Sequence, residues 1–147
     1  MLIGNKKIFA FLIDDLEEGS GDLQSVNIWI NNEDVTYIDN IVYLPQFVQS
    51  LKNDLLWMRS NRIKECIGVK TEKDAVKKYF KELDEEAVKY RFLNYGPTTD
   101  DVRSFIFESE NSIFIIYKLN DSITVKSISI CKPELKQIYE RIIEVLS

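Results

Sequence analysis

The chain has 147 residues, of which 45% are hydrophobic and 12% aromatic, and these values suit one globular domain with its own core. It contains no histidine and only two cysteines, which excludes Ser-His-Asp and Cys-His catalysis and structural zinc of the usual Cys/His kind. No apolar run approaches the roughly 18 residues that a membrane helix requires. We therefore expect residues 1–147 to form one cytoplasmic domain that makes no contact with a membrane.

Negative charge is concentrated in the first third of the chain. The sequence has 24 acidic and 19 basic residues, a formal net charge of −5. Residues 1–50 hold eight acids and two lysines, whereas the rest of the chain is close to balance. This concentration of negative charge disfavours the binding of nucleic acid and favours the binding of a basic protein. The same excess of acids also serves solubility, and the sequence alone does not separate these two interpretations.

Two strands are predicted before residue 33. Residues 7–14, KIFAFLID, are apolar nearly throughout and indicate a central strand. Residues 25–32 alternate, with Val26, Ile28 and Ile30 on one face and Trp29 on the other. A turn and a third strand at residues 35–39 should follow. We expect Trp29 to be covered by a helix or offered to a partner, and coverage is the favoured interpretation.

The remaining chain predicts helices around a three-stranded meander. Pro45 opens an apolar stripe that indicates a helix to about residue 59, and Thr71 is the expected N-cap of a second helix over residues 72–83. Three β-rich runs follow at residues 103–110, 112–119 and 122–131, with a bulge near Ser127. Pro133 then opens a C-terminal amphipathic helix. The prediction is an α+β fold, mainly antiparallel sheet packed with two to four helices.

An acidic connection, LIDDLEEGSGD, joins the first two predicted strands. Its five carboxylates belong to Asp14, Asp15, Glu17, Glu18 and Asp22. Read as a calcium loop from its first aspartate, it places leucine at the third position and serine at the twelfth, where the metal needs ligands. The sequence also lacks a glycine-rich phosphate loop. We therefore predict no metal, no cofactor and no catalytic residue.

Three short motifs resemble a known family. Ile3-Gly4-Asn5, Phe9-Ala10-Phe11 and the strand that ends in Ile30-Asn31-Asn32 are similar to the opening of immunity protein 42, a family of bacterial polymorphic-toxin and contact-dependent growth inhibition systems. The sequence departs from the family pattern at Asn32, where glycine is expected. Asparagine tolerates the left-handed conformation that such a turn needs. The resemblance extends over about the first third of the chain.

The resemblance implies a cytoplasmic protein that binds the C-terminal domain of a cognate toxin and blocks it without catalysis. Toxin domains of such systems are commonly basic nucleases, which an acidic surface would attract. On the charge distribution, the expected toxin-binding residues are Asp14, Asp15, Glu17, Glu18, Asp22, Trp29, Glu33 and Asp34.

Two other hypotheses stay open at this point. One is a small-ligand-binding protein or histidine-free enzyme that uses carboxylate, tyrosine and lysine groups. The other is a binding subunit of a larger assembly. The sequence leaves the oligomeric state undetermined.

Overall fold

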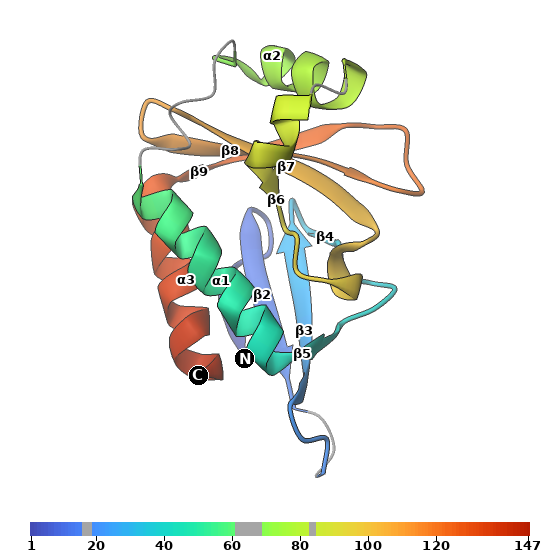
Figure 1. Ribbon diagram of the computed structural model, residues 1–147, viewed down its shortest axis with the longest axis vertical. Coiled ribbons are helices and arrows are strands. Elements are labelled where there is room, and N and C mark those ends of the chain that lie inside the picture. Colours follow the sequence, from blue (N-terminus) through green and yellow to red (C-terminus); the bar gives the residue numbers. More distant parts are fainter. Residues whose placement is uncertain (16–18, 61–68, 83–84) are drawn as a thin grey trace.

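The computed structural model describes residues 1–15, 19–60, 69–82 and 85–147, which contain two antiparallel sheets (Figure 1). The N-terminal sheet has the strand order β1-β2-β3-β4, and β5 pairs with the first half of β3. Its strands are β1 (Leu2–Asn5), β2 (Phe9–Asp14), β3 (Leu23–Ile30), β4 (Glu33–Asp34) and β5 (Ile41–Tyr43). The C-terminal sheet has the order β6-β7-β8-β9. Its strands are β6 (Arg91–Phe92), β7 (Val102–Ser109), β8 (Ser112–Leu119) and β9 (Lys126–Cys131).

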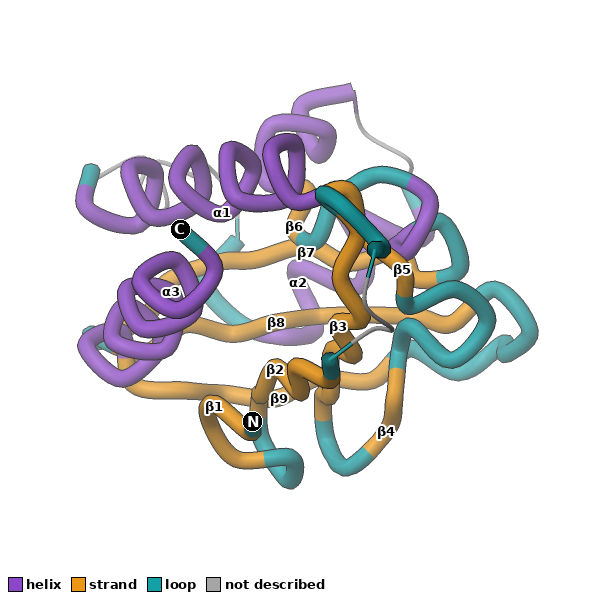
Figure 2. Tube along the Cα trace, turned by 90° about the horizontal axis from the view of Figure 1, so that it is seen from below, coloured by secondary structure: helices purple, strands orange, loops and turns teal. Residues whose placement is uncertain are grey.

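Two long helices, α1 (Leu44–Arg59) and α3 (Lys132–Leu146), lie side by side against one face of the N-terminal sheet (Figures 1 and 2). Each has a proline in its first turn, where the missing N–H costs nothing. The predicted apolar stripe of α1, which comprises Phe47, Leu51, Leu55 and Met58, is buried. Both predicted helices are thus confirmed. Within the described residues, no helix is both long and apolar enough to cross a membrane.

The C-terminal sheet lies across the end of this sheet-and-helix layer (Figures 1 and 2). Its outer face is covered by α2 (Glu72–Val76) and by a π-helical turn, Lys77–Lys81. A 3-10 turn, Glu85–Tyr90, leads into β6, and another, Pro97–Thr99, precedes β7. Tyr79 stacks on Phe105 in the small outer cluster, with ring centroids 4.8 Å apart. The C-terminal sheet therefore has hydrophobic contacts on both of its faces.

Aromatic side chains of β2 fill the main core. Phe11 contacts Phe47 of α1 at a centroid distance of 6.4 Å and Tyr139 of α3 at 5.6 Å. Phe9 lies 5.3 Å from Phe11 in an edge-on arrangement, which aromatic pairs prefer. Because these residues alternate with Ala10 and Leu12 along the strand, one face of β2 points toward the helices.

The predicted strand at residues 35–39 is wrong. The chain instead turns there, because the Asp34 carboxylate accepts hydrogen bonds from the Thr36 backbone N–H at 2.9 Å and from its hydroxyl at 2.8 Å. The Thr36 hydroxyl oxygen in turn accepts from the N–H of Ile28 at 3.0 Å. These side-chain bonds replace a strand ladder with a local turn. Strand β1, in contrast, has no counterpart among the predicted strands.

Two further expectations are corrected. β8 and β9 pair without interruption from Ser112 opposite Cys131 to Tyr117 opposite Lys126, so no bulge exists near Ser127. Val125 lies before β9 begins at Lys126, so it does not have to follow the alternation of the strand. The helix predicted over residues 72–83 does begin at Glu72, and Thr71 is its N-cap, whose hydroxyl accepts from the N–H of Asp74 at 3.2 Å. It becomes π-helical at residue 77, and its predicted last position lies outside the described residues.

Candidate functional site

Three of the five carboxylates in the acidic connection are exposed at one end of the molecule. Asp14 ends β2, Asp15 follows it, and Asp22 precedes β3. In Figure 1 the end of β2 and the start of β3 lie at the end of the long axis opposite to α2. None of the three carboxylates takes part in the ion pairs found among the described residues. Glu17 and Glu18 lie outside the described residues.

Glu33 is bonded within the protein. Its carboxylate accepts from Lys126 Nζ at 2.5 Å and from the Tyr117 hydroxyl at 2.8 Å. The hydrogen bond from Lys126 lowers the pKa of Glu33, against the opposing effect of burial. Burial, followed by the hydrogen bond to Glu33, raises the pKa of Tyr117. Because Glu33 belongs to β4 and its partners to β8 and β9, the cluster joins the two sheets.

Asp34 and Trp29 occupy the face of the N-terminal sheet that points away from α1 and α3. Asp34 organises the turn described above and also accepts from the Asn27 side chain at 2.8 Å. Trp29 is half-buried, with Lys6 Nζ 4.3 Å from its ring centroid, a cation–π contact. Its indole Nε1 is buried and has no hydrogen-bond partner within the described residues.

The residues predicted for toxin binding do not come together in one site. The exposed carboxylates lie near the start of β3, and Trp29, Glu33 and Asp34 lie near its far end. Trp29 stands seven residue steps beyond Asp22 along β3, about 23 Å at the usual rise per residue. The sequence shows which acidic residues are close along the chain. It does not show at which end of a strand, or on which face, their side chains lie.

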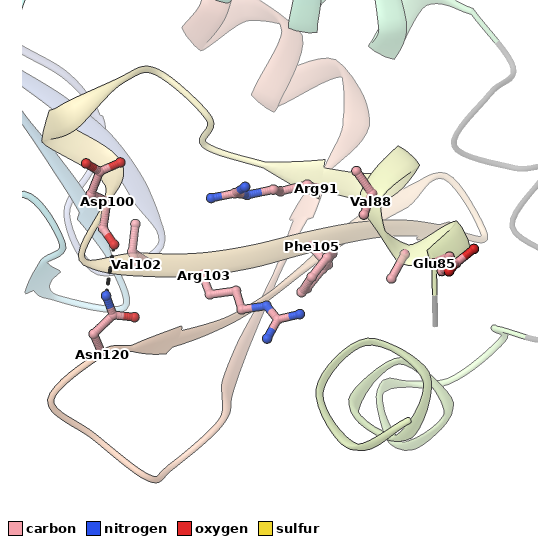
Figure 3. A pocket seen from close by; sticks show the side chains of 9 residues that line it. Glu85, Val88, Arg91, Asp100, Val102, Arg103, Phe105 and Asn120 are labelled. Carbon is pink, nitrogen blue, oxygen red and sulfur yellow. Dashed lines mark hydrogen bonds between the residues drawn. The ribbon is translucent and has the colours of Figure 1, made fainter. Parts of the chain in front are cut away.

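An additional groove, formed by residues that were not among the predicted site residues, lies beside α2 on the outer face of the C-terminal sheet. It consists of two neighbouring cavities of about 410 Å³ each, which share Arg103 and Asn120. The first is bordered by Val88 of the 3-10 turn, Arg91 of β6 and Phe105 of β7 (Figure 3). The second is lined by side chains from the π-helical turn and the β8–β9 hairpin, among them Phe80, Lys81, Lys118 and Ile123. We call these two cavities the Arg103 groove.

Cations outnumber carboxylates in the Arg103 groove. Arg91, Arg103, Lys81 and Lys118 line it, and the two carboxylates that share the lining are those of Glu85 and Asp100. Figure 3 shows these two acids toward opposite ends of the first cavity, with both arginines between them. None of the four cations takes part in the ion pairs identified within the described ranges. The middle of the groove therefore carries positive charge.

The backbone register creates this concentration of charge. Arg103 of β7 stands directly opposite Lys118 of β8, and like charges in such a position destabilise a sheet. The guanidinium carbon of Arg103 also lies 5.7 Å from the ring centroid of Phe80 and 5.3 Å from that of Phe105, as in cation–π contacts. The sequence contains one signal of this pairing. A tight turn at Asn111, between the predicted strands at residues 103–110 and 112–119, places Arg103 opposite Lys118. The described part of the chain contains no cluster of three metal-ligating side chains.

Comparison with protein families identifies the chain. The model of immunity protein 42 matches residues 1–145. The chain belongs to the immunity protein 42 family. The resemblance first seen in the N-terminal third is thus confirmed, and it extends over almost the whole sequence. No match was found among curated proteins.

A solved structure shows the same fold as this immunity protein 42 member. It is the crystal structure of CdiI from Burkholderia dolosa AUO158, with a TM-score of 0.63 and 15% sequence identity, and the similarity covers 98% of this chain and 99% of that chain. At this identity the similarity concerns the fold, and function has to be argued from the family and the site.

The family motif has a structural reason in this immunity protein. Gly4 stands in β1 with a φ of +100°, which side-chain-bearing residues rarely adopt. A Cβ atom at this position would meet the Phe9 carbonyl oxygen and would lie 3.2 Å from Cδ1 of Ile138. The glycine therefore lets the first hairpin approach α3 closely.

Proposed function

We propose that this protein binds the C-terminal domain of a cognate bacterial toxin and neutralises it by forming a tight non-covalent complex inside the producing cell. The observation that carries the proposal is the family match over residues 1–145. An inhibitor of this kind needs no catalytic group of its own, so we propose that the protein is not an enzyme.

We further propose that the toxin is basic and of the nuclease type, and that the acidic end of the immunity protein attracts it. Asp14, Asp15 and Asp22 support this proposal because they are exposed and form no ion pair among the described residues. Complementary charge mainly accelerates association, to about 10⁸ per molar per second or more at low salt. Glu33 and Asp34, which are bonded internally, would contribute less to such a surface.

Coexpression with the product of the adjacent open reading frame tests the proposal. We expect growth rescue and a stable complex that survives size-exclusion chromatography. A toxin that still kills in the presence of this protein, with no complex formed, would refute the immunity function.

A charge-reversal variant tests the acidic end separately. The variant Asp14→Lys, Asp15→Lys, Asp22→Lys should slow association markedly at low salt and change dissociation little. A matched control reverses three other exposed acids, Glu110, Glu134 and Glu144, and should associate faster than the first variant. Equal association rates for the two variants would show that total charge alone matters and that the acidic end is not the contact.

A further inference from the structure

We propose that the Arg103 groove is a second toxin-binding surface, which receives an acidic segment of the toxin that carries a carboxylate next to an apolar side chain. This inference rests on the proposed immunity function and adds a contact to it. Helix α2, which contributes Val76 to the lining of the groove, lies at the end of the long axis opposite to the strand ends that carry the exposed acids (Figure 1). A toxin that engages both the groove and these acids therefore lies along the length of the immunity protein.

The Arg103 groove gathers like charges at an electrostatic cost. Arg103 and Lys118 face each other across β7 and β8, and Arg91 and Lys81 line the same groove. A protein whose acids outnumber its bases by 24 to 19 nevertheless gathers four cations there. A carboxylate placed among them would relieve this repulsion, and that gain would appear only in the complex.

Arg103 is held in position by two aromatic rings. Its guanidinium lies over the faces of Phe80 and Phe105, which restricts its orientation. Arg103 takes part in no ion pair among the described residues, so its N–H groups are available for a bidentate bond to a carboxylate. Little conformational entropy is then lost when an acidic partner binds.

Exposed apolar side chains lie beside these cations. Val88 is 71% exposed at one side of the groove and Ile123 is 97% exposed at the other. Phe105 forms part of the lining between them. Aliphatic side chains that project this far favour a partner that brings an apolar residue beside its carboxylate. Acidic and apolar groups in one short segment therefore fit the groove best.

The test measures the affinity of purified wild-type and variant proteins for the toxin domain encoded by the adjacent open reading frame. The double variant Arg91→Ala, Arg103→Ala should raise Kd about 30-fold or more, mainly through faster dissociation. Arg103→Lys retains the positive charge but loses the planar guanidinium that can form a bidentate bond. Its Kd should therefore lie between that of the wild-type protein and that of the double variant. The matched control is Arg141→Ala with Lys52→Ala, which removes two exposed cations elsewhere and should leave Kd nearly unchanged. Thermal unfolding of each variant verifies that it is folded.

The possible failures are distinguishable. If the wild-type protein does not bind the toxin, the proposed function itself fails. If the wild-type protein binds and the groove variant binds equally well, the immunity function stands and the groove inference is wrong.

Calorimetry with citrate and with phosphate separates a protein segment from a small ligand. Tight binding of either anion that is lost in Arg103→Ala, with toxin affinity unchanged, would overturn the proposal in favour of a small-ligand site. Self-association of the wild-type protein that is lost in the same variant, again with toxin affinity unchanged, would assign the groove to a second copy. Neither result is expected.

Discussion

Tyr95 donates its phenolic hydrogen to the carboxylate of Asp54, which ties the connection between β6 and β7 to helix α1. The hydroxyl of Tyr139, on α3, lies 2.5 Å from the hydroxyl of Tyr95. Burial raises the pKa of Asp54 to about 7, and the hydrogen bond from Tyr95 opposes this shift. Burial also raises the pKa values of both tyrosines. Three parts of the fold thus meet at one carboxyl group that titrates near neutral pH.

The Asp54 cluster should make the protein less stable as the pH rises from about 4 to 7. In that window the folded state holds a proton that the unfolded chain, with an ordinary pKa of 3.8, has released. The free energy of unfolding then falls by up to about 1.4 kcal/mol per pH unit. This contribution is complete below the unfolded pKa and is lost above the folded one. Urea unfolding at several pH values between 4 and 8.5 measures the slope.

The variant Asp54→Asn should remove this pH dependence, because its amide oxygen still accepts from Tyr95 but carries no charge. We expect it to be more stable than the wild-type protein at pH 8. The exposed position Asp22 provides the control Asp22→Asn, which makes the same change in charge away from the cluster. A slope that is unchanged in Asp54→Asn would assign the pH dependence to other groups.

Glu33 should give a pH effect of opposite sign. The lowered pKa of Glu33 means that the folded state favours the carboxylate. Its contribution is present above the ordinary pKa of 4.5 and is lost as the pH falls below it. Because about a third of each side chain in the Glu33–Lys126 pair is exposed, we expect Glu33→Gln to cost less than about 1 kcal/mol at pH 7. A double-mutant cycle with Lys126→Met, measured at pH 7 and pH 3.5, gives the coupling energy of the Glu33–Lys126 pair. An equal coupling energy at the two pH values would contradict the expected pH effect.

Gly4 should not tolerate a side chain. Gly4→Ala forces an unfavourable φ and pushes a methyl group against the Phe9 carbonyl and Ile138, so we expect a loss of roughly 2–5 kcal/mol. Gly21 isolates the backbone effect, because its φ is +64° and, apart from its chain neighbours, no atom of the described residues lies within 4 Å of a Cβ built there. Gly21→Ala should therefore cost only about 1 kcal/mol. Chemical denaturation of both variants gives the comparison, and equal losses would argue against the steric explanation.

The turn between β3 and β4 should accept glycine in place of Asn32. Asn31 and Asn32 have φ values of 53° and 63°, and Ile30 pairs with Glu33 across them, as in a type I′ hairpin turn. Asn32→Gly, which restores the expected family residue, should change stability by less than about 0.5 kcal/mol, whereas Asn32→Ala should cost about 1 kcal/mol or more. Thermal unfolding of the two variants measures the difference. A neutral alanine would mean that the turn relaxes to another conformation.

Most of the fold was predictable because its elements bury regular apolar faces. The alternation in β3 and the spacing in α1 identified the residues that are buried. β1 was not predictable, since its four residues include an unusual glycine and show one buried position only. The prediction of a strand at residues 35–39 was wrong because the side chains of Asp34 and Thr36 accept backbone hydrogen bonds. These bonds stabilise a turn in spite of the β-propensity of the segment.

The candidate surfaces were predictable only in part. The acidic connection is contiguous in the sequence, so its exposed carboxylates could be identified directly. The Arg103 groove draws Lys81, Arg91 and Lys118 from three separate elements, and strand register and the π-helical turn bring them together. Glu33 was expected at the surface, yet the geometry of its turn aims it at Lys126 of the other sheet. Such long-range relationships are properties of the tertiary structure.

The small cluster under α2 has a consequence for local opening. Far fewer buried side chains support the outer layer than support the main core, so α2 and the π-helical turn should detach from the sheet in partial unfolding events while the rest stays folded. Phe80 and Lys81, which form one wall of the Arg103 groove, belong to this layer. Amide hydrogens of residues 77–81 should therefore exchange with solvent faster than those of α1 and α3. A ligand that fills the groove would slow that exchange, so deuterium uptake of this turn would report occupancy directly.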